Sequence, residues 1–255
     1  MRASGVTDLA YLDSTDAAYV RTFRAQIRAR PPGAVVLDRT YFYAAGGGQP
    51  ADRGLFHVPS GRTVEVVDVT KSGSAVLHRT RGTPGALDDL AVGTEVEGVL
   101  DFERRYRHMR LHTAQHFLSA RIFARANIRT QKAKLGGREG TLDLEGMVVA
   151  GILPELAEDA SEALSRPRPV RIRHVPRAEW DLHPSTRSGL VRLAAHIDPV
   201  RVIEIDGIDA CPCGGTHVRS TDEIGRIAIR DPVPLAGGCC RLTFTLSEET
   251  ATPSA

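Results

Sequence analysis

The sequence changes character at Asp101, and this change constrains the fold more than any other feature. From about Val35 to Leu100, glycine and proline interrupt short runs of apolar residues and leave little room for a long helix. Several of these runs alternate apolar and polar residues, as strands do. Arg104–Ala126 then continues without glycine or proline and repeats apolar residues at helical spacing. We therefore expect a small, glycine-rich β-barrel over residues 1–100 and a second domain over residues 101–248.

Local signals indicate the arrangement within each domain. A short amphipathic helix is expected before the barrel at Asp16–Arg30, where Pro31 and Pro32 would stop it. In the second domain we expect helices flanked by strands, which makes an α+β layer with an antiparallel sheet. The helices are Arg104–Ala126 and Pro154–Leu164, and the strands are Thr141–Leu144, Val170–Val175, Arg201–Ile205, Ile224–Ile229 and Arg241–Leu246. Residues 249–255 are expected to form a disordered tail.

Composition excludes several classes of protein. The chain has 255 residues, of which 42% are apolar and 25% are charged, as in an ordinary soluble globular protein. A formal charge of +2 argues against a protein that coats nucleic acid by bulk electrostatics, so any RNA contact must be local. Asp8, Asp13 and Asp16 leave no apolar segment long enough for a signal peptide or a membrane span near the N-terminus. We expect a cytoplasmic protein with no membrane partner, and the oligomeric state is left open.

Two histidines on the long expected helix are candidate metal ligands. His112 and His116 are four residues apart, so their imidazoles project from one face of the helix, one turn apart, as two ligands of one ion require. His108 extends the same spacing, but roughly 12 Å along the helix axis separates it from His116, and only one adjacent pair can bind one ion. The alternative is a helix whose histidines face solvent.

A second half of the site follows roughly one hundred residues later. Cys213 and His217 enclose the glycine pair Gly214 and Gly215, which lets the backbone turn both side chains toward one point. One thiolate with three imidazoles is a tetrahedral ligand set that favours Zn²⁺. The alternative is a turn with a buried cysteine and a surface histidine. Cys211 could supply a second thiolate, but we assign it a supporting position beside the ligands.

A glycine-rich segment and a run of arginines are candidate contacts to a substrate. Three successive glycines can bring backbone N–H groups close to an anion or a ribose, and a tight loop or bulge in the barrel is the alternative. Arginines just before and within the zinc helix would bring phosphates near the metal, whereas a solvated helix face is the alternative. The glycine segment comprises Gly46, Gly47, Gly48 and Gln49, and the arginines are Arg104, Arg105, Arg107 and Arg110. The aromatic run Tyr41–Tyr43 could stack on bases or fill the barrel core.

Three motifs together resemble the editing module of alanyl-tRNA synthetases. Thr40–Gly54 (TYFYAAGGGQPADRG) is similar to the glycine-rich segment of the family's barrel, Leu111–Leu118 (LHTAQHFL) to its first zinc motif, and Cys213–Val218 (CGGTHV) to its second. The similarity spans roughly Val35 to Leu246. Neither the HIGH signature of aminoacylation nor a long C-terminal extension is present. The chain therefore resembles the medium-sized form of the AlaX proteins, the free-standing relatives of that editing module.

The resemblance implies a trans-editing hydrolase. Its substrate would be mischarged seryl-tRNA(Ala), with glycyl-tRNA(Ala) as a second candidate, bound by the acceptor end at a zinc-dependent site, and correctly charged alanyl-tRNA would be spared. The family's substrate-side positions fall near Thr130 and Gln131. Relatives carry lysines before the last strand, whereas residues 235–240 of this chain contain none. Arg241 alone would therefore bind tRNA there. The candidate contacts are Thr130, Gln115 and Gln131 for catalysis, and Gly46, Gly47, Gly48, Gln49, Arg107 and Arg241 for substrate and tRNA.

The expected ligand count conflicts with catalysis. Four protein ligands normally describe a closed structural zinc, whereas catalytic zinc keeps one position open. Editing therefore requires that one ligand is displaced, that the metal accepts a fifth ligand, or that it binds the amino or hydroxyl group of the substrate. Two other functions are the alternatives: a non-catalytic RNA-binding protein of translation with a structural zinc, and a zinc hydrolase of another small ester.

Overall fold

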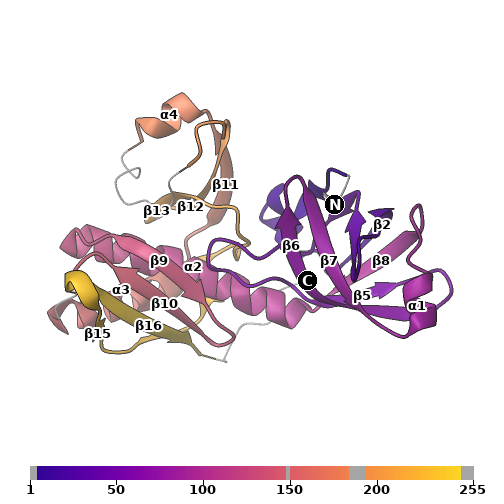
Figure 1. Ribbon diagram of the computed structural model, residues 1–255. Helices are drawn as coiled ribbons and strands as arrows, with labels where there is room; N and C mark the ends of the chain where they lie inside the picture. The colour runs from indigo at the N-terminus through magenta and orange to yellow at the C-terminus, as the bar shows by residue number, and fades with distance from the viewer. Residues whose placement is uncertain (1–4, 148–149, 184–192, 248–255) are drawn as a thin grey trace. The chain divides into compact units, whose positions relative to one another are not determined.

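The computed structural model describes residues 5–147, 150–183 and 193–247 and has an α+β fold (Figure 1). The chain divides into two compact units. The first comprises Met1–Gly46 and Pro50–Tyr106, and the second comprises Gly47–Gln49 and Arg107–Ala255. A short piece of the glycine segment thus packs with a different unit from its neighbours in sequence. The expected fold class is confirmed, and the expected disordered tail at 249–255 lies outside the described residues.

The first unit contains the expected β-barrel, which closes in the order β2-β3-β7-β6-β5-β8 with every pair antiparallel. Its strands are β2 (Thr22–Ala29), β3 (Ala34–Leu37), β5 (Gly54–His57), β6 (Thr63–Ser72), β7 (Ala75–Arg81) and β8 (Glu95–Leu100). Shorter elements are β1 (Asp8–Leu9), which pairs with β4 (Arg39–Thr40), α1 (Pro84–Asp88), and 3₁₀ turns at Ala10–Leu12 and Asp16–Tyr19. Aromatic side chains, including Phe42 and Phe56, fill the interior.

The prediction of a helix at Asp16–Arg30 is wrong. Only Asp16–Tyr19 is helical, as a 3₁₀ turn, and strand β2 follows. Phe23, Ala25 and Ile27 are buried at alternate positions, and the residues between them are more exposed. Because successive side chains of a strand point to opposite faces, this spacing of two places all three in the barrel core.

The main sheet of the second unit has the order β14-β16-β10-β9, and β15 also pairs with β16. Its strands are β9 (Thr130–Leu135), β10 (Glu139–Leu144), β14 (Ile227–Ile229), β15 (Val233–Pro234) and β16 (Cys240–Leu246). Helix α2 (Phe102–Ala126) begins in the first unit and continues into the second, where α3 (Leu153–Ser165) is its neighbour. Arg125 of α2 joins the two helices through an ion pair with Asp159 of α3, at 2.7 Å.

A smaller antiparallel sheet in the order β11-β12-β13 leads into the cysteine loop. It consists of β11 (Val170–Val175), β12 (Val200–Ile205) and β13 (Asp209–Pro212), with α4 (Arg177–Asp181) after β11 and 3₁₀ turns at Ala150–Ile152, Thr221–Ile224 and Ala236–Gly238. Trp180 packs with Val200 and Val202 in its own small core. The expected strand at Ile224–Ile229 is shorter than expected, because Ile224 ends a 3₁₀ turn. Strands β9 and β13 were not expected.

Two observations bear on the expected environment of the chain. All four cysteines, Cys211, Cys213, Cys239 and Cys240, are free thiols. Across the described ranges, no helix combines the length and the apolar character that a membrane span needs. The cytoplasmic location stays a prediction.

Candidate metal centre

Helix α2 carries two of the expected ligands on one buried face. His112 and His116 are separated by one helical turn, and their ring centroids are 5.3 Å apart. Both residues are almost fully buried, at 2% and 4% exposure. His108 is also buried but is not a member of the cluster that the other two form.

The loop after β13 supplies the other two ligands. Cys213 and His217 lie on either side of Gly214, Gly215 and Thr216. A Cβ atom at Gly215 would lie 2.1 Å from Cε1 of His112, whereas a Cβ at Gly214 would meet nothing within 4 Å. The second glycine is therefore required for the loop to pass close to the His112 ring.

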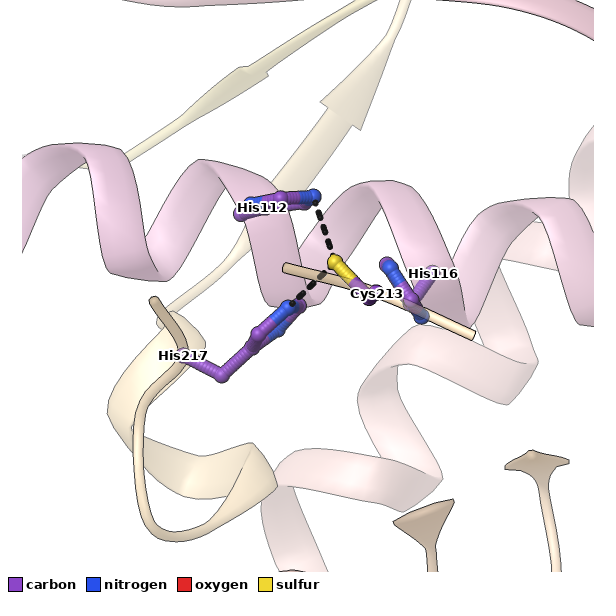
Figure 2. A group of neighbouring side chains, drawn as sticks. All are labelled: His112, His116, Cys213 and His217. Atoms are coloured by element: carbon purple, nitrogen blue, oxygen red, sulfur yellow. Dashed lines mark hydrogen bonds between the residues drawn. The ribbon is translucent and has the colours of Figure 1, made fainter. Parts of the chain in front are cut away.

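The four expected ligands lie together in one cluster (Figure 2). Their ligand atoms all lie within 4.8 Å of one another. Sγ of Cys213 is 3.5 Å from Nε2 of His112 and 3.4 Å from Nε2 of His217. The rings of His112 and His217 are 4.3 Å apart, and those of His116 and His217 are 4.7 Å apart. The cluster could hold a metal ion.

Burial and proximity perturb the pKa values in the cluster. Burial lowers the pKa of His116, but hydrogen bonds to Asp209 and Cys213 outweigh this effect and raise the pKa to about 10. Burial raises the pKa of Cys213, but the neighbouring His112 and His217 bring it well below its ordinary value. Burial also holds the pKa of His217 well below the ordinary value. The lowered pKa of Cys213 favours its thiolate, the form that binds metals.

Each imidazole also has a partner at its other nitrogen. Nδ1 of His112 lies 2.8 Å from Oε1 of Gln49. Nδ1 of His116 lies 3.0 Å from Oδ2 of Asp209, and Nδ1 of His217 lies 3.1 Å from Oγ1 of Thr113. Partners of this kind fix the orientation of metal-binding histidines in other proteins.

A second group of potential ligands overlaps the first. His116, Asp209 and Cys211 also have their ligand atoms within 4.8 Å of one another. Asp209, however, contacts Nδ1 of His116, and Cys211 is not a member of the group of four. The larger group contains three imidazoles and a thiolate, so it is the better candidate for a metal.

The candidate catalytic residues form part of a hydrogen-bond chain. Thr130 and Gln115 are buried, and both contact Ser119 of α2. Oγ1 of Thr130 lies 2.8 Å from Oγ of Ser119, and Nε2 of Gln115 donates to the same atom at 3.1 Å. Gln131 is exposed and is the extra residue of a β-bulge, because Lys132 and Thr130 pair with consecutive residues of β10.

The glycine segment is divided between the two units. The carbonyl of Gly46 accepts a hydrogen bond from the hydroxyl of Tyr43 in the first unit, at 2.8 Å. The carbonyl of Gly48 accepts one from the backbone N–H of Leu135 in the second, at 2.9 Å. The segment from Gly47 through Gly48 ends in Gln49, which is 2% exposed and contacts His112.

The arginine run of α2 is largely engaged within the protein. Arg105 is fully buried in the first unit, where it pairs with Asp52 and donates to the carbonyl of Ala18 at 2.9 Å. Arg110 is buried in the second unit and donates to backbone carbonyls, including that of Ile224 at 2.8 Å. Arg107 is exposed.

Arg241, the other arginine expected to contact tRNA, already has a partner. It lies directly across from Asp143 in the pairing of β16 with β10. Its Nε and NH2 groups donate to the two carboxylate oxygens at 2.7 and 2.9 Å. The guanidinium holds the pKa of Asp143 below its ordinary value. A phosphate would have to compete with this ion pair.

Sequence reasoning missed four residues around the cluster: Gln49 as a partner of a histidine, Thr113, Ser119 and Asp209. Asp209 left a weak signal, because carboxylates are common partners of metal-bound histidines and Asp209 lies shortly before the cysteine loop. No comparable signal connects Gln49 or Ser119 with the site.

The chain matches two families of translation proteins. Residues 12–104 match the tRNA synthetases class II (A), and residues 200–243 match the threonyl and alanyl tRNA synthetase second additional domain. The second match includes the cysteine loop of the cluster. The chain thus combines one region similar to class II tRNA synthetases with another similar to this additional domain.

Similar proteins identify the family of the chain. The alanine–tRNA ligase of Pyrobaculum neutrophilum is 35% identical over 250 residues, which are 93% of this chain and 26% of the ligase. The alanyl-tRNA editing protein AlaX-M of Methanosarcina acetivorans is 35% identical over 89% of this chain and 95% of its own length. The AlaX-M protein of Methanosarcina barkeri is 33% identical over 83% of this chain and 88% of its own length. The chain spans about a quarter of the ligases it matches. It belongs to the AlaX-M family of alanyl-tRNA editing proteins, as the motifs indicated.

Proposed function

We propose that this protein is a zinc-dependent aminoacyl-tRNA deacylase that edits in trans. Its substrate is mischarged seryl-tRNA(Ala), with glycyl-tRNA(Ala) as a second substrate, and it acts in the cytoplasm. The observation that carries the proposal is the convergence of His112, His116, Cys213 and His217 in a chain related over most of its length to proteins named for alanyl-tRNA editing.

The donor set fits zinc. Tetrahedral nitrogen and sulfur ligands at the usual zinc distances lie roughly 3.5 Å apart. The distances from the Cys213 sulfur to the nearest imidazole nitrogens, 3.5 and 3.4 Å, agree with that value. When bound, zinc would supply Lewis acidity that polarises an ester carbonyl.

The protein's own residues have to select the aminoacyl group. Serine exceeds alanine by one hydroxyl, and a pocket that hydrogen-bonds this group rejects its absence strongly. Thr130 and Gln115 offer polar groups for that contact, and their shared partner Ser119 holds both side chains in place. Gln131 is exposed and would contact the substrate from the outside.

Contacts to the acceptor end of tRNA are assigned to exposed groups. Arg107 is exposed on α2 and can bind a phosphate. Gly46 and Gly47 are exposed, so their backbone N–H groups can approach the ribose or phosphate. Gly48, Gln49 and Arg241 have contacts within the protein, so we expect smaller contributions from them.

The deciding experiment uses zinc-loaded protein with tRNA(Ala) charged with serine, glycine or alanine. We expect hydrolysis of the seryl and glycyl esters and none of the alanyl ester. The matched control is the His116→Ala variant, which should be inactive while it still folds. Absence of hydrolysis by zinc-loaded protein would overturn the proposal, and tRNA binding without turnover would favour a non-catalytic RNA-binding protein with a structural zinc.

A further inference from the structure

The side chain of Gln49 has a fixed orientation in the metal centre. Its Nε2 donates to Oγ1 of Thr216 at 2.9 Å, and its Oε1 accepts from the backbone N–H of Thr216 at 3.2 Å. The oxygen is therefore the atom that faces His112, 2.8 Å from Nδ1. Because an amide oxygen only accepts, His112 must carry its proton on Nδ1.

This proton position leaves Nε2 of His112 as the nitrogen with a lone pair. Nε2 is the atom that lies 3.5 Å from the Cys213 sulfur. For His116, the carboxylate of Asp209 likewise only accepts, so Nδ1 carries a proton and Nε2 is the ring nitrogen left to face the cluster. For His217, the hydroxyl of Thr113 donates to the carbonyl of Met109 at 2.9 Å, so toward Nδ1 it accepts. All three imidazoles thus present Nε2 to the cluster.

Gly48 and Gly215 are two positions near this contact where the backbone passes too close to other atoms for a side chain. A Cβ at Gly48, whose φ is +85°, would lie 2.4 Å from the carbonyl oxygen of Ala133. A Cβ at Gly215 would lie 3.0 Å from Oε1 of Gln49 and 2.1 Å from the His112 ring. Gln49 itself is 2% exposed and makes its contacts within the second unit. The glycine segment therefore places Gln49 beside Nδ1, the imidazole nitrogen of His112 that points away from the cluster.

We propose that Gln49 is a positioning residue of the metal centre, which fixes the tautomer and orientation of His112 so that Nε2 is presented to the metal. This inference rests on the zinc site of the proposed function. It gives the glycine segment a role in metal binding in addition to any contact with tRNA. Asp209 and Thr113 have the corresponding place behind His116 and His217.

The test compares zinc dissociation constants of variants by competition with a chelator. Gln49→Leu keeps the size of the side chain but removes the acceptor, and we expect zinc to bind about 10- to 100-fold more weakly. Gln49→Glu keeps an acceptor for Nδ1 and should bind zinc within a few-fold of wild type. Gln26→Leu is the matched control, because Gln26 donates to the carbonyl of Gly93 in the barrel and has no link to the cluster.

A second measurement does not depend on how well a variant folds. In the zinc-loaded wild type, nitrogen chemical shifts of the imidazoles should show His112 with a proton on Nδ1 and the metal on Nε2. Metal on Nδ1, or equal zinc affinity for Gln49→Leu and wild type, would overturn the role of Gln49 alone. Failure of the wild type to bind zinc would overturn the zinc site of the proposed function as well.

Discussion

At the scale of single residues, the two cysteines on either side of Pro212 have different surroundings. Sγ of Cys213 faces two imidazole nitrogens, whereas Cys211 shares a group only with His116 and Asp209. We expect Cys213→Ser to lose most bound zinc and Cys211→Ser to retain about one equivalent per chain. Elemental analysis of the purified variants measures this. Near-complete loss from Cys211→Ser would make Cys211 a ligand.

Thr130 is the residue at which substrate selection can be tested. Replacing Thr130 with valine keeps the shape and removes the hydroxyl, so hydrolysis of seryl-tRNA should slow by roughly 10-fold or more, as the loss of one hydrogen bond implies. Glycyl-tRNA has no side-chain hydroxyl and should be hydrolysed at nearly the wild-type rate. Steady-state rates on both substrates check this. Equal slowing on the two would assign Thr130 a structural role through Ser119 instead.

Sequence spacing predicts some site residues and not others, for a physical reason. The pair His112 and His116 and the loop from Cys213 to His217 are local patterns, so the helix period and the glycine pair predict the direction of their side chains. The partner of His112 is Gln49, 63 residues earlier in the chain. Only the tertiary fold brings these two residues together, so no local sequence pattern predicts their contact.

Among the elements, the cysteine loop passes very close to the ring of His112 at Gly215, and substitutions in the loop can test whether this close approach is needed. Gly215→Ala would force a Cβ to 2.1 Å from the His112 ring, so we expect weaker zinc binding and a loss of about 1–3 kcal/mol in stability, as overpacking costs. Gly214→Ala is the matched control, because its Cβ meets nothing within 4 Å. Chelator competition and thermal unfolding measure both. Similar results for the two variants would contradict a specific need for glycine at position 215.

The elements themselves were predictable where one period dominates. Helix α2 follows from a long run without glycine or proline, and β11 coincides with the expected Val170–Val175. The region of β2 contains both periods, and the helical interpretation failed because Phe23, Ala25 and Ile27 have a barrel interior to fill. Arg105 and Arg110 were expected to face solvent or RNA, but buried carboxylate and carbonyl groups bind them instead. Burial of charge depends on such partners, which the sequence does not identify.

At the scale of the whole molecule, folding stability at acidic pH depends on a histidine of the barrel. His78 is fully buried in the first unit beside Phe42 and Phe56. Its Nδ1 lies 3.3 Å from the carbonyl of Val35, and its Nε2 lies 2.8 Å from the hydroxyl of Thr40. The carbonyl requires a donor at Nδ1, so the neutral ring has both nitrogens satisfied when Thr40 donates to Nε2.

Burial lowers the pKa of His78 from 6.5 to about 4. The unfolded chain therefore binds this proton more readily than the folded chain, and the neutral ring stabilises the fold fully above pH 6.5. This stabilisation falls as the pH drops from 6.5 toward 4, by about 3 kcal/mol in total. The variant His78→Gln can keep both hydrogen bonds without titrating. Urea unfolding between pH 4 and 7 should show a steeper loss of stability for wild type than for the variant, and parallel curves would contradict a neutral, buried His78.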